Sequence, residues 1–184
     1  MSHLSCCSEL AHTESDALSR RGFVRLAALG GAAALFASFK PFAAQAAGNT
    51  EALLLSCMDF RLLDEIVKYM DGRSLTNNYD HVVLAGASLG ALYEKKPSWG
   101  QTFWDHVDVA QQLHHIKKVI VMDHRDCGAY KVFISPDHAK TPKDEFDVHA
   151  TYLRKLRDEI KKRFPALEVE LLLMGLDGKV ETVS

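Results

Sequence analysis

Four short apolar runs, separated by stretches with helical spacing, limit this chain to few folds. The runs cover residues 53–56, 81–85, 119–122 and 169–173. Two of them precede polar or reactive side chains, Cys57 and Asp123, and the other two precede glycines. Strands that alternate with helices predict a parallel sheet. Near-continuous apolar strands are typical of a sheet covered on both faces. We therefore expect an α/β fold, a single domain with a mainly parallel β-sheet flanked by helices.

Two of the stretches between the apolar runs have the spacing of amphipathic helices. Leu62, Ile66 and Tyr69 share one helical face in the first. In the second, a charged segment between two prolines, four apolar residues recur at helical intervals: Leu153, Leu156, Ile160 and Phe164. Proline-containing stretches at residues 94–100 and 135–143 are expected to be loops.

The first 46 residues have the pattern of an export signal. A twin-arginine sequence, SRRGF at residues 19–23, precedes a moderately apolar stretch at residues 26–39, and Ala-Gln-Ala at residues 44–46 fits a cleavage site. The apolar stretch is shorter than the roughly 20 residues that span a bilayer, which disfavours a permanent anchor. We expect a twin-arginine (Tat) signal peptide at 1–46, a folded domain at 47–184, and a periplasmic protein without stable membrane insertion after cleavage.

Two motifs place thiols, a histidine and opposite charges directly after apolar runs. Cys57, Asp59 and Arg61 alternate in LLLSCMDFR, whereas His124 and Cys127 lie in VIVMDHRDCG. Ligands of open parallel sheets bind beyond the carboxyl ends of the strands. If the two strands are neighbours, both motifs meet at one edge of the sheet.

Two thiols and one imidazole are a donor set that suits zinc. A catalytic zinc site with two cysteines and one histidine keeps its fourth position for water or substrate. We therefore expect one Zn²⁺ per chain on Cys57, His124 and Cys127. Asp59 can occupy the fourth position or accept a hydrogen bond from water there, and Arg61 can hold the Asp59 carboxylate ionised and oriented.

Other arrangements of these residues stay open. A disulfide between Cys57 and Cys127 is the ordinary expectation for two thiols in an exported domain, and a redox-active dithiol would use the same pair. Asp59 and Arg61 could form a plain ion pair at a strand end. The remaining histidines of the mature chain are expected to be surface or core residues without a ligand role: His81, His106, His114, His115, His138 and His149.

The order and spacing of the two motifs resemble a known enzyme family. C-x-D-x-R at Cys57, Asp59 and Arg61, followed by H-x-x-C-G at His124 and Cys127, is similar to the β-class carbonic anhydrases, as are IKKVIVMDH and LLLMGLDGKVETV. The resemblance implies zinc on Cys57, His124 and Cys127, a catalytic Asp59–Arg61 dyad, and reversible hydration of carbon dioxide to bicarbonate through zinc-bound hydroxide. It also implies a homodimer or higher homo-oligomer.

The chain departs from the family pattern in two places. Phe60 stands where family members commonly have serine, and VLAGASLGAL keeps Ala85 and Gly86 but lacks the arginine and asparagine that usually accompany them. Two alternatives therefore accompany the main expectation: a non-catalytic zinc protein in which Asp59 fills the fourth position, and an enzyme for a carbon–sulfur analogue of carbon dioxide. The net charge of -2 gives no indication of nucleic-acid binding.

Overall fold

The computed structural model describes residues 48–184, which form a 5-stranded sheet with helices on both faces. The strand order is β2-β1-β3-β4-β5. The first four strands run parallel and the last is antiparallel to its neighbour: β1 (Ala52–Cys57), β2 (Tyr79–Leu84), β3 (Lys118–His124), β4 (Glu168–Met174) and β5 (Val180–Thr182). The predicted α/β class with a mainly parallel sheet is confirmed. The predicted signal peptide lies outside the described residues.

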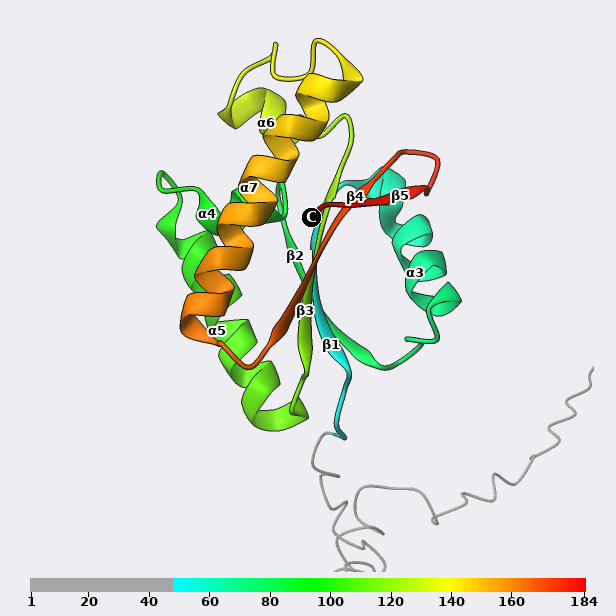
Figure 1. Cartoon of the computed structure of the whole chain (residues 1–184), viewed down its shortest axis with the longest axis vertical. Helices are drawn as coiled ribbons and strands as arrows, with labels where there is room; N and C mark the ends of the chain where they lie inside the picture. Colours follow the sequence, from blue (N-terminus) through cyan, green and yellow to red (C-terminus); the bar gives the residue numbers. More distant parts are fainter. Residues whose placement is uncertain (1–47) are drawn as a thin grey trace, which may run out of the picture. The chain divides into compact units, whose positions relative to one another are not determined.

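Helices cover the sheet on its two faces (Figure 1). In chain order they are the 3₁₀ helix η2 (Phe60–Leu62) and the α-helices α3 (Leu63–Gly72), α4 (Ser88–Leu92), α5 (Pro97–His114), α6 (Gly128–Phe133) and α7 (Pro142–Arg163). Helix α3 lies on one face, whereas α4, α5 and α7 lie on the other. Among these helices none is both long enough and apolar enough to cross a bilayer.

The alternation of side chains along β1 explains why both faces are covered. Leu53 and Leu55 pack into the core that α5 and α7 complete, whereas Ala52 and Leu54 pack into the core beneath α3. Every residue of β1 is buried. A strand in the middle of a parallel sheet has no polar face, since both sides exclude water.

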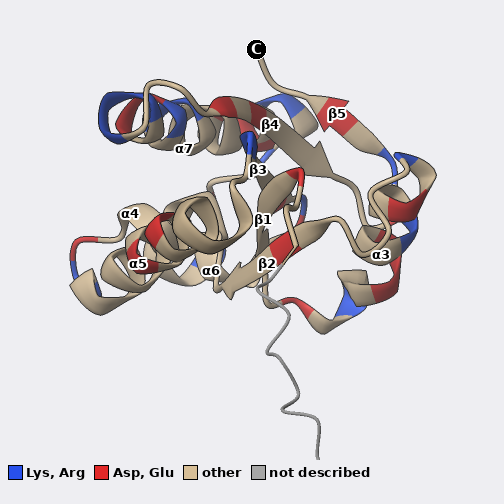
Figure 2. Ribbon diagram, turned by 90° about the horizontal axis from the view of Figure 1, so that it is seen from below, with Lys and Arg blue, Asp and Glu red and all other residues tan. Residues whose placement is uncertain are grey.

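Local sequence signals fix where α7 begins. Thr141 is its N-cap: the Thr141 hydroxyl oxygen accepts the backbone N–H of Asp144, and the Asp144 carboxylate accepts the N–H of Thr141. Pro142 follows in the first turn, where its missing N–H costs no helical hydrogen bond. Both acidic and basic residues lie along α3 and α7 (Figure 2). Of the predicted apolar face of α7, Leu153, Leu156 and Ile160 are buried, whereas Phe164 is half-buried directly after the helix.

The predicted loop at residues 94–100 is partly helical. Helix α5 begins at Pro97, so the proline starts a helix there, in a position where its fixed φ is already suitable. The inner side of α5 carries Phe103, Trp104 and Val107, which are buried in the core. The apolar spacing of Phe103, Trp104 and Val107 therefore indicates a helix, although Pro97 and its neighbours are also typical of a loop.

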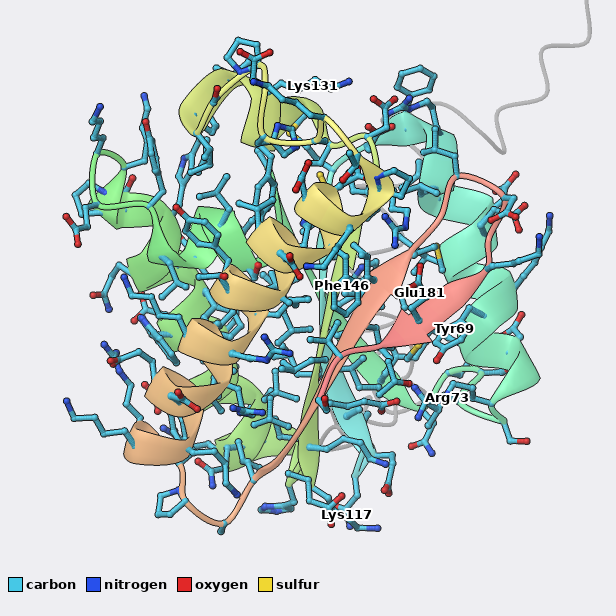
Figure 3. All side chains as sticks on the ribbon, turned by 45° about the horizontal axis from the view of Figure 1, so that its top comes forward. Tyr69, Arg73, Lys117, Lys131, Phe146 and Glu181 are labelled. Carbon is cyan, nitrogen blue, oxygen red and sulfur yellow. The ribbon has the colours of Figure 1, made fainter. Side chains whose placement is uncertain are left out.

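A side-chain anchor holds α3 against the other face of the sheet. Arg73, directly after α3, donates a hydrogen bond of 2.8 Å to Glu170 on β4, and its guanidinium lies 5.4 Å from the centre of the Tyr69 ring (Figure 3). Such cation–π contacts add modest stabilisation at partly exposed sites. These contacts tie the carboxyl end of α3 to β4.

The strands β1 and β3 are neighbours at the point where the strand order reverses. From β1 the chain continues to β2 on one side, whereas β3 pairs with the opposite edge of β1. Crevices for ligands form at such switch points, beyond the carboxyl ends of the strands. Cys57 is the last residue of β1 and His124 is the last residue of β3. The sheet therefore brings both motifs to one place.

Candidate metal centre

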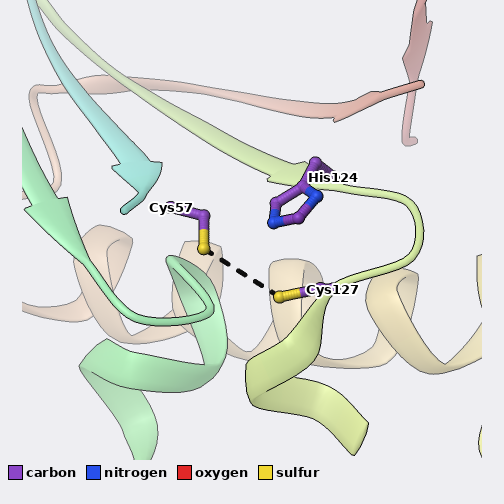
Figure 4. A group of neighbouring side chains, drawn as sticks. All are labelled: Cys57, His124 and Cys127. Carbon is purple, nitrogen blue, oxygen red and sulfur yellow. Dashed lines mark hydrogen bonds between the residues drawn. The ribbon is translucent and has the colours of Figure 1, made fainter. Parts of the chain in front are cut away.

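Three side chains from separate segments converge at the switch point (Figure 4). Cys57 comes from β1 and His124 from β3, while Cys127 is the N-cap residue of α6. One donor atom of each lies within 4.8 Å of the other two. All three residues are buried. The structure thus brings together the three residues that the sequence predicts as metal ligands.

The distance between the two sulfur atoms distinguishes a disulfide from a shared metal ion. The Sγ atoms of Cys57 and Cys127 are 4.0 Å apart, and both cysteines are free thiols. A disulfide bond would need about 2.05 Å. Two sulfurs bound at about 2.3 Å to one tetrahedral zinc ion would be roughly 3.8 Å apart. The spacing therefore fits a shared metal ion and is not that of the alternative disulfide.

The His124 ring has one satisfied nitrogen and one without a partner. Its Nδ1 lies 2.8 Å from the backbone oxygen of Arg125 and donates its hydrogen there, whereas Nε2 is buried without a hydrogen-bond partner. Metal-binding histidines commonly anchor their second ring nitrogen to a carbonyl in this way. An unpaired buried nitrogen is costly. A zinc ion beside Nε2 would use its lone pair, so the residues fit this metal.

The surroundings of Cys57 favour its thiolate form. A hydrogen bond from the Cys127 thiol, the neighbouring His124 imidazole and a hydrogen bond from the Gly86 N–H lower the pKa of Cys57 to about 4. The Gly86 nitrogen is 3.2 Å from the Cys57 sulfur. The pKa of Cys127 is raised, because its thiol donates to Cys57 and is buried beside that negative charge. A divalent cation would allow both thiols to ionise together.

Asp59 and Arg61 form a two-point ion pair beside the three donor atoms. Arg61 Nε lies 2.9 Å from Asp59 Oδ1, and Nη2 lies 2.8 Å from Oδ2. These hydrogen bonds lower the pKa of Asp59 to about 2, so the carboxylate is ionised at neutral pH. Asp59 Oδ2 is also 3.8 Å from His124 Nε2. A fixed, charged acceptor therefore stands next to the place where a metal ion would bind.

Arg61 also joins the two motifs to each other. Its Nη1 donates to Asp126 Oδ2 at 2.8 Å, and its Nη2 donates to the Asp126 backbone oxygen at 3.1 Å. Asp126 has a φ of 58°, a left-handed conformation that is uncommon outside glycine and turns the chain between His124 and Cys127. The sequence gives no indication of this ion pair, because Arg61 and Asp126 are 65 residues apart.

A buried polar network supports the end of β3. Asp123 accepts hydrogen bonds from the Ser88 hydroxyl at 2.7 Å, the Ser88 N–H at 2.9 Å, the Tyr130 hydroxyl at 2.6 Å and His149 Nδ1 at 2.9 Å. Four donors occupy the lone pairs of this carboxylate, which makes its burial tolerable. Since His124 is the next residue, the network ties its backbone to α4, α6 and α7.

An apolar cavity of about 330 Å³ opens beside Cys57 and Asp59. Its other walls are formed by Met58, Phe60, Ala85, Gly128, Ala129, Val132 and Phe133. A small, uncharged molecule could approach the three donor atoms from this cavity. The side chain of Phe60, at a position where the sequence departs from the family pattern, forms part of that approach.

We expect Gly86→Ala to weaken both the fold and metal binding. Gly86 has a φ of +77°, and an added Cβ would lie 3.0 Å from the Cβ of Ala129. The left-handed backbone and this contact should lower the free energy of unfolding by about 1–2 kcal/mol. The Gly86 N–H would also move away from the Cys57 sulfur. Denaturant unfolding and competition with a zinc chelator measure the two effects.

Gly72→Ala is the matched control for this substitution. Gly72 ends α3, and a Cβ added there meets no atom within 4 Å. This variant should change the free energy of unfolding by no more than about 0.5 kcal/mol and leave zinc affinity unchanged. Equal behaviour of the two glycine variants would contradict the role given to Gly86.

Comparison of the sequence with known families and proteins gives consistent matches. Residues 47–184 match the family model described as "Putative carbonic anhydrase". An uncharacterized protein of Rickettsia conorii is 47% identical over 131 residues, which are 71% of this chain and 70% of that protein. An uncharacterized protein of Rickettsia bellii is 46% identical over 131 residues, which are 71% of this chain and 80% of that protein.

Solved structures with a similar fold include a carbonic anhydrase from Streptococcus mutans. It has a TM-score of 0.53 and 14% identity, with 88% of this chain and 97% of that chain covered. One of two tetrameric β-carbonic anhydrases from Sordaria macrospora has a TM-score of 0.52 and 11% identity, with 90% and 98% covered. At such identities the similarity establishes a shared fold.

Proposed function

The chain belongs to the carbonic anhydrase family whose model it matches over residues 47–184, and we propose that it is a zinc-dependent lyase for the reversible hydration of carbon dioxide to bicarbonate. One observation carries the proposal: the donor atoms of Cys57, His124 and Cys127 converge at the end of the sheet, and His124 Nε2 has no other partner. Two thiolates and one imidazole are ligands that zinc accepts at catalytic sites.

Cys57, His124 and Cys127 would hold the zinc ion. When bound, zinc acts as a Lewis acid and lowers the pKa of a water molecule at its open position, which supplies the nucleophile for carbon dioxide. The apolar cavity beside Cys57 admits an uncharged substrate of this size. The two thiolates neutralise the charge of the ion, so this effect on the water is expected to be smaller than in a site with three histidines.

Asp59 would orient that water molecule, and Arg61 would position Asp59. With a pKa of about 2, the Asp59 carboxylate is a strong hydrogen-bond acceptor but a poor proton acceptor near neutral pH. Both carboxylate oxygens of Asp59 are held by the Arg61 guanidinium. Arg61 also donates to Asp126 and so connects the loop after β1 to the loop after β3. Because its hydrogen bonds go to protein groups, Arg61 is a positioning residue.

A second candidate is a zinc protein in which Asp59 is the fourth ligand. The distance of 3.8 Å between Asp59 Oδ2 and His124 Nε2 favours this candidate, because ligand atoms of one tetrahedral zinc ion are about 3.4 Å apart.

Stopped-flow measurement of carbon dioxide hydration by the zinc-loaded chain from pH 6 to 9 tests the proposed hydration activity. Hydration that increases with pH supports the enzyme, whereas no hydration at pH 9 with zinc bound supports the second candidate and overturns the first.

We propose that the chain forms homodimers or higher homo-oligomers through the rim of the apolar cavity. Met58, Phe60 and Val132 line this cavity, and they are 64%, 82% and 76% exposed. Large apolar side chains that are exposed together mark interaction surfaces. A β-carbonic anhydrase of similar fold from Sordaria macrospora is tetrameric, which supports a second copy of this chain as the partner.

Val132→Lys should shift the chain towards monomers. A lysine in the middle of an apolar interface would have to be buried without a partner, so we expect at least a tenfold rise in the dimer dissociation constant, or about 1.4 kcal/mol. Sedimentation velocity over a range of concentrations measures it. Leu113→Lys, on α5 at a position that is 58% exposed, should leave association unchanged. An unaltered association for Val132→Lys would place the interface elsewhere.

We further propose that the protein is exported by the Tat route to the periplasm. The twin-arginine sequence at residues 19–23 and the apolar stretch at residues 26–39 support this proposal. A zinc site that combines strands distant in the sequence must be assembled by folding. Export in the folded state would allow metal loading before translocation.

A further inference from the structure

A second group of metal-binding side chains lies on the α7 side of the sheet. His138 precedes α7, whereas Glu145 and His149 are four residues apart on α7 and therefore on one helical face. One donor atom from each of the three residues lies within 4.8 Å of the other two. None of them has a role in the centre formed by Cys57, His124 and Cys127.

Both histidines of this group have a buried nitrogen without a partner. His149 is fully buried and His138 is 9% exposed, and no hydrogen bond reaches Nε2 of either ring. The other nitrogen is anchored in each case: His149 Nδ1 to the Asp123 carboxylate at 2.9 Å, and His138 Nδ1 to the Ser135 backbone oxygen at 2.8 Å. Metal-binding histidines are oriented in this manner, by a carboxylate or a carbonyl behind the ring.

Glu145 contributes a carboxylate that retains free lone pairs. Its Oε1 accepts the backbone N–H of Asp126 at 2.6 Å, and its Oε2 accepts Arg125 Nη1 at 3.1 Å. Each carboxylate oxygen has two lone pairs, so each can still bind a cation. Arg125 is shared with Glu181, which it reaches at 2.7 Å, so its charge is divided between two carboxylates.

We propose that His138, Glu145 and His149 bind a second divalent transition-metal ion, of the kind represented by Zn²⁺. Two imidazoles and one carboxylate are a set that zinc accepts with a water molecule in the fourth position. Ligand atoms of a tetrahedral zinc ion are about 3.4 Å apart, so side-chain movements of about an ångström would complete the site. This site has no sulfur ligand, which distinguishes it from the centre at Cys57.

The second site is connected to the first through the backbone of residues 123–127. Asp123 holds His149, and the N–H of Asp126 is held by Glu145. Metal bound at the second site would restrain His149 and Glu145 and thereby stabilise their contacts with Asp123 and Asp126. It would thereby hold the loop that carries His124 and Cys127, so we expect it to stabilise the fold even when the thiolate centre has been removed.

Metal analysis of the zinc-saturated full chain tests this proposal directly. The wild type should bind one zinc ion per chain more than His138→Gln. A variant with all four cysteines replaced by serine (Cys6→Ser, Cys7→Ser, Cys57→Ser, Cys127→Ser) should keep one ion bound. His106→Gln, which changes an exposed histidine on α5, is the matched control and should lose none. Equal zinc content in the wild type and His138→Gln would overturn the proposal, as would an equal loss in His106→Gln.

Cobalt and thermal unfolding supply independent measurements. Co²⁺ bound to this thiol-free variant should show ligand-field absorption but no thiolate-to-cobalt charge transfer. Adding His138→Gln should abolish the ligand-field absorption. Zn²⁺ should raise the melting temperature of the folded thiol-free variant, but not after His138→Gln. A thiol-free variant that binds neither ion while folded would overturn the second site. These outcomes do not depend on the proposed hydration activity, which the thiolate centre alone would supply.

Discussion

Cys57→Ser should remove zinc from the thiolate centre and reduce carbon dioxide hydration by at least about a hundredfold, because the reaction depends on the ion. A serine hydroxyl does not ionise under conditions in which the Cys57 thiol does, since the pKa of that thiol is lowered to about 4. The variant would therefore lose a charged, soft ligand at the end of β1. Two remaining ligands, His124 and Cys127, bind zinc far less tightly than three.

Metal analysis and stopped-flow hydration measure the two effects of Cys57→Ser. Zinc content should fall by one ion per chain. Ser56→Ala is the matched control, because Ser56 is buried next to Cys57 but its hydroxyl lies 2.7 Å from His81 Nε2, away from the three donor atoms. We expect this control to keep its zinc. Full activity in Cys57→Ser would show that hydration, if present, does not occur at this centre.

Asp59→Asn should reduce hydration about a hundredfold and leave zinc in place, a loss of the size expected when one oriented hydrogen-bonding group is removed from an active site. The amide keeps the size of the side chain but loses the charge that Arg61 binds at two points. Because the pKa of Asp59 is about 2, the wild-type carboxylate is ionised from pH 6 to pH 9. The ratio of wild-type to variant activity should therefore be the same at both ends of this range.

The control for Asp59→Asn is Asp64→Asn, which removes an exposed carboxylate from the first turn of α3. It should keep full activity. Unchanged activity in Asp59→Asn would remove Asp59 from the mechanism. Loss of zinc from Asp59→Asn, in contrast, would identify Asp59 as a ligand of the ion.

The four parallel strands and the three converging donors could be predicted because their signals are local, whereas the short antiparallel β5 was not among the predicted strands. The apolar run before Cys57 and the one before His124 each end in the residue that carries the chemistry, and parallel strands place such ends together. Helix α7 was also recognisable from its apolar spacing. Helix α5 was only partly recognisable, because Pro97 is compatible with either a loop or a first helical turn.

The contacts that support the centre could not be predicted, since they depend on how distant segments pack. Nothing in the sequence brings Arg61 to Asp126, because the register of the two loops decides that contact. The grouping of His138, Glu145 and His149 could not be predicted for a similar reason. Glu145 and His149 have the spacing of one helical turn, but this spacing is common, and His138 joins them only through the path of the loop before α7.

Zinc X-ray absorption spectroscopy tests the central claim most directly, that two sulfurs and one imidazole bind the same zinc ion. The His138→Gln variant loaded with one equivalent of zinc confines the metal to the thiolate centre. We predict two sulfur atoms at about 2.3 Å, one imidazole nitrogen and one further light atom at about 2.0–2.1 Å. A spectrum without sulfur, or with four sulfurs, would contradict the account.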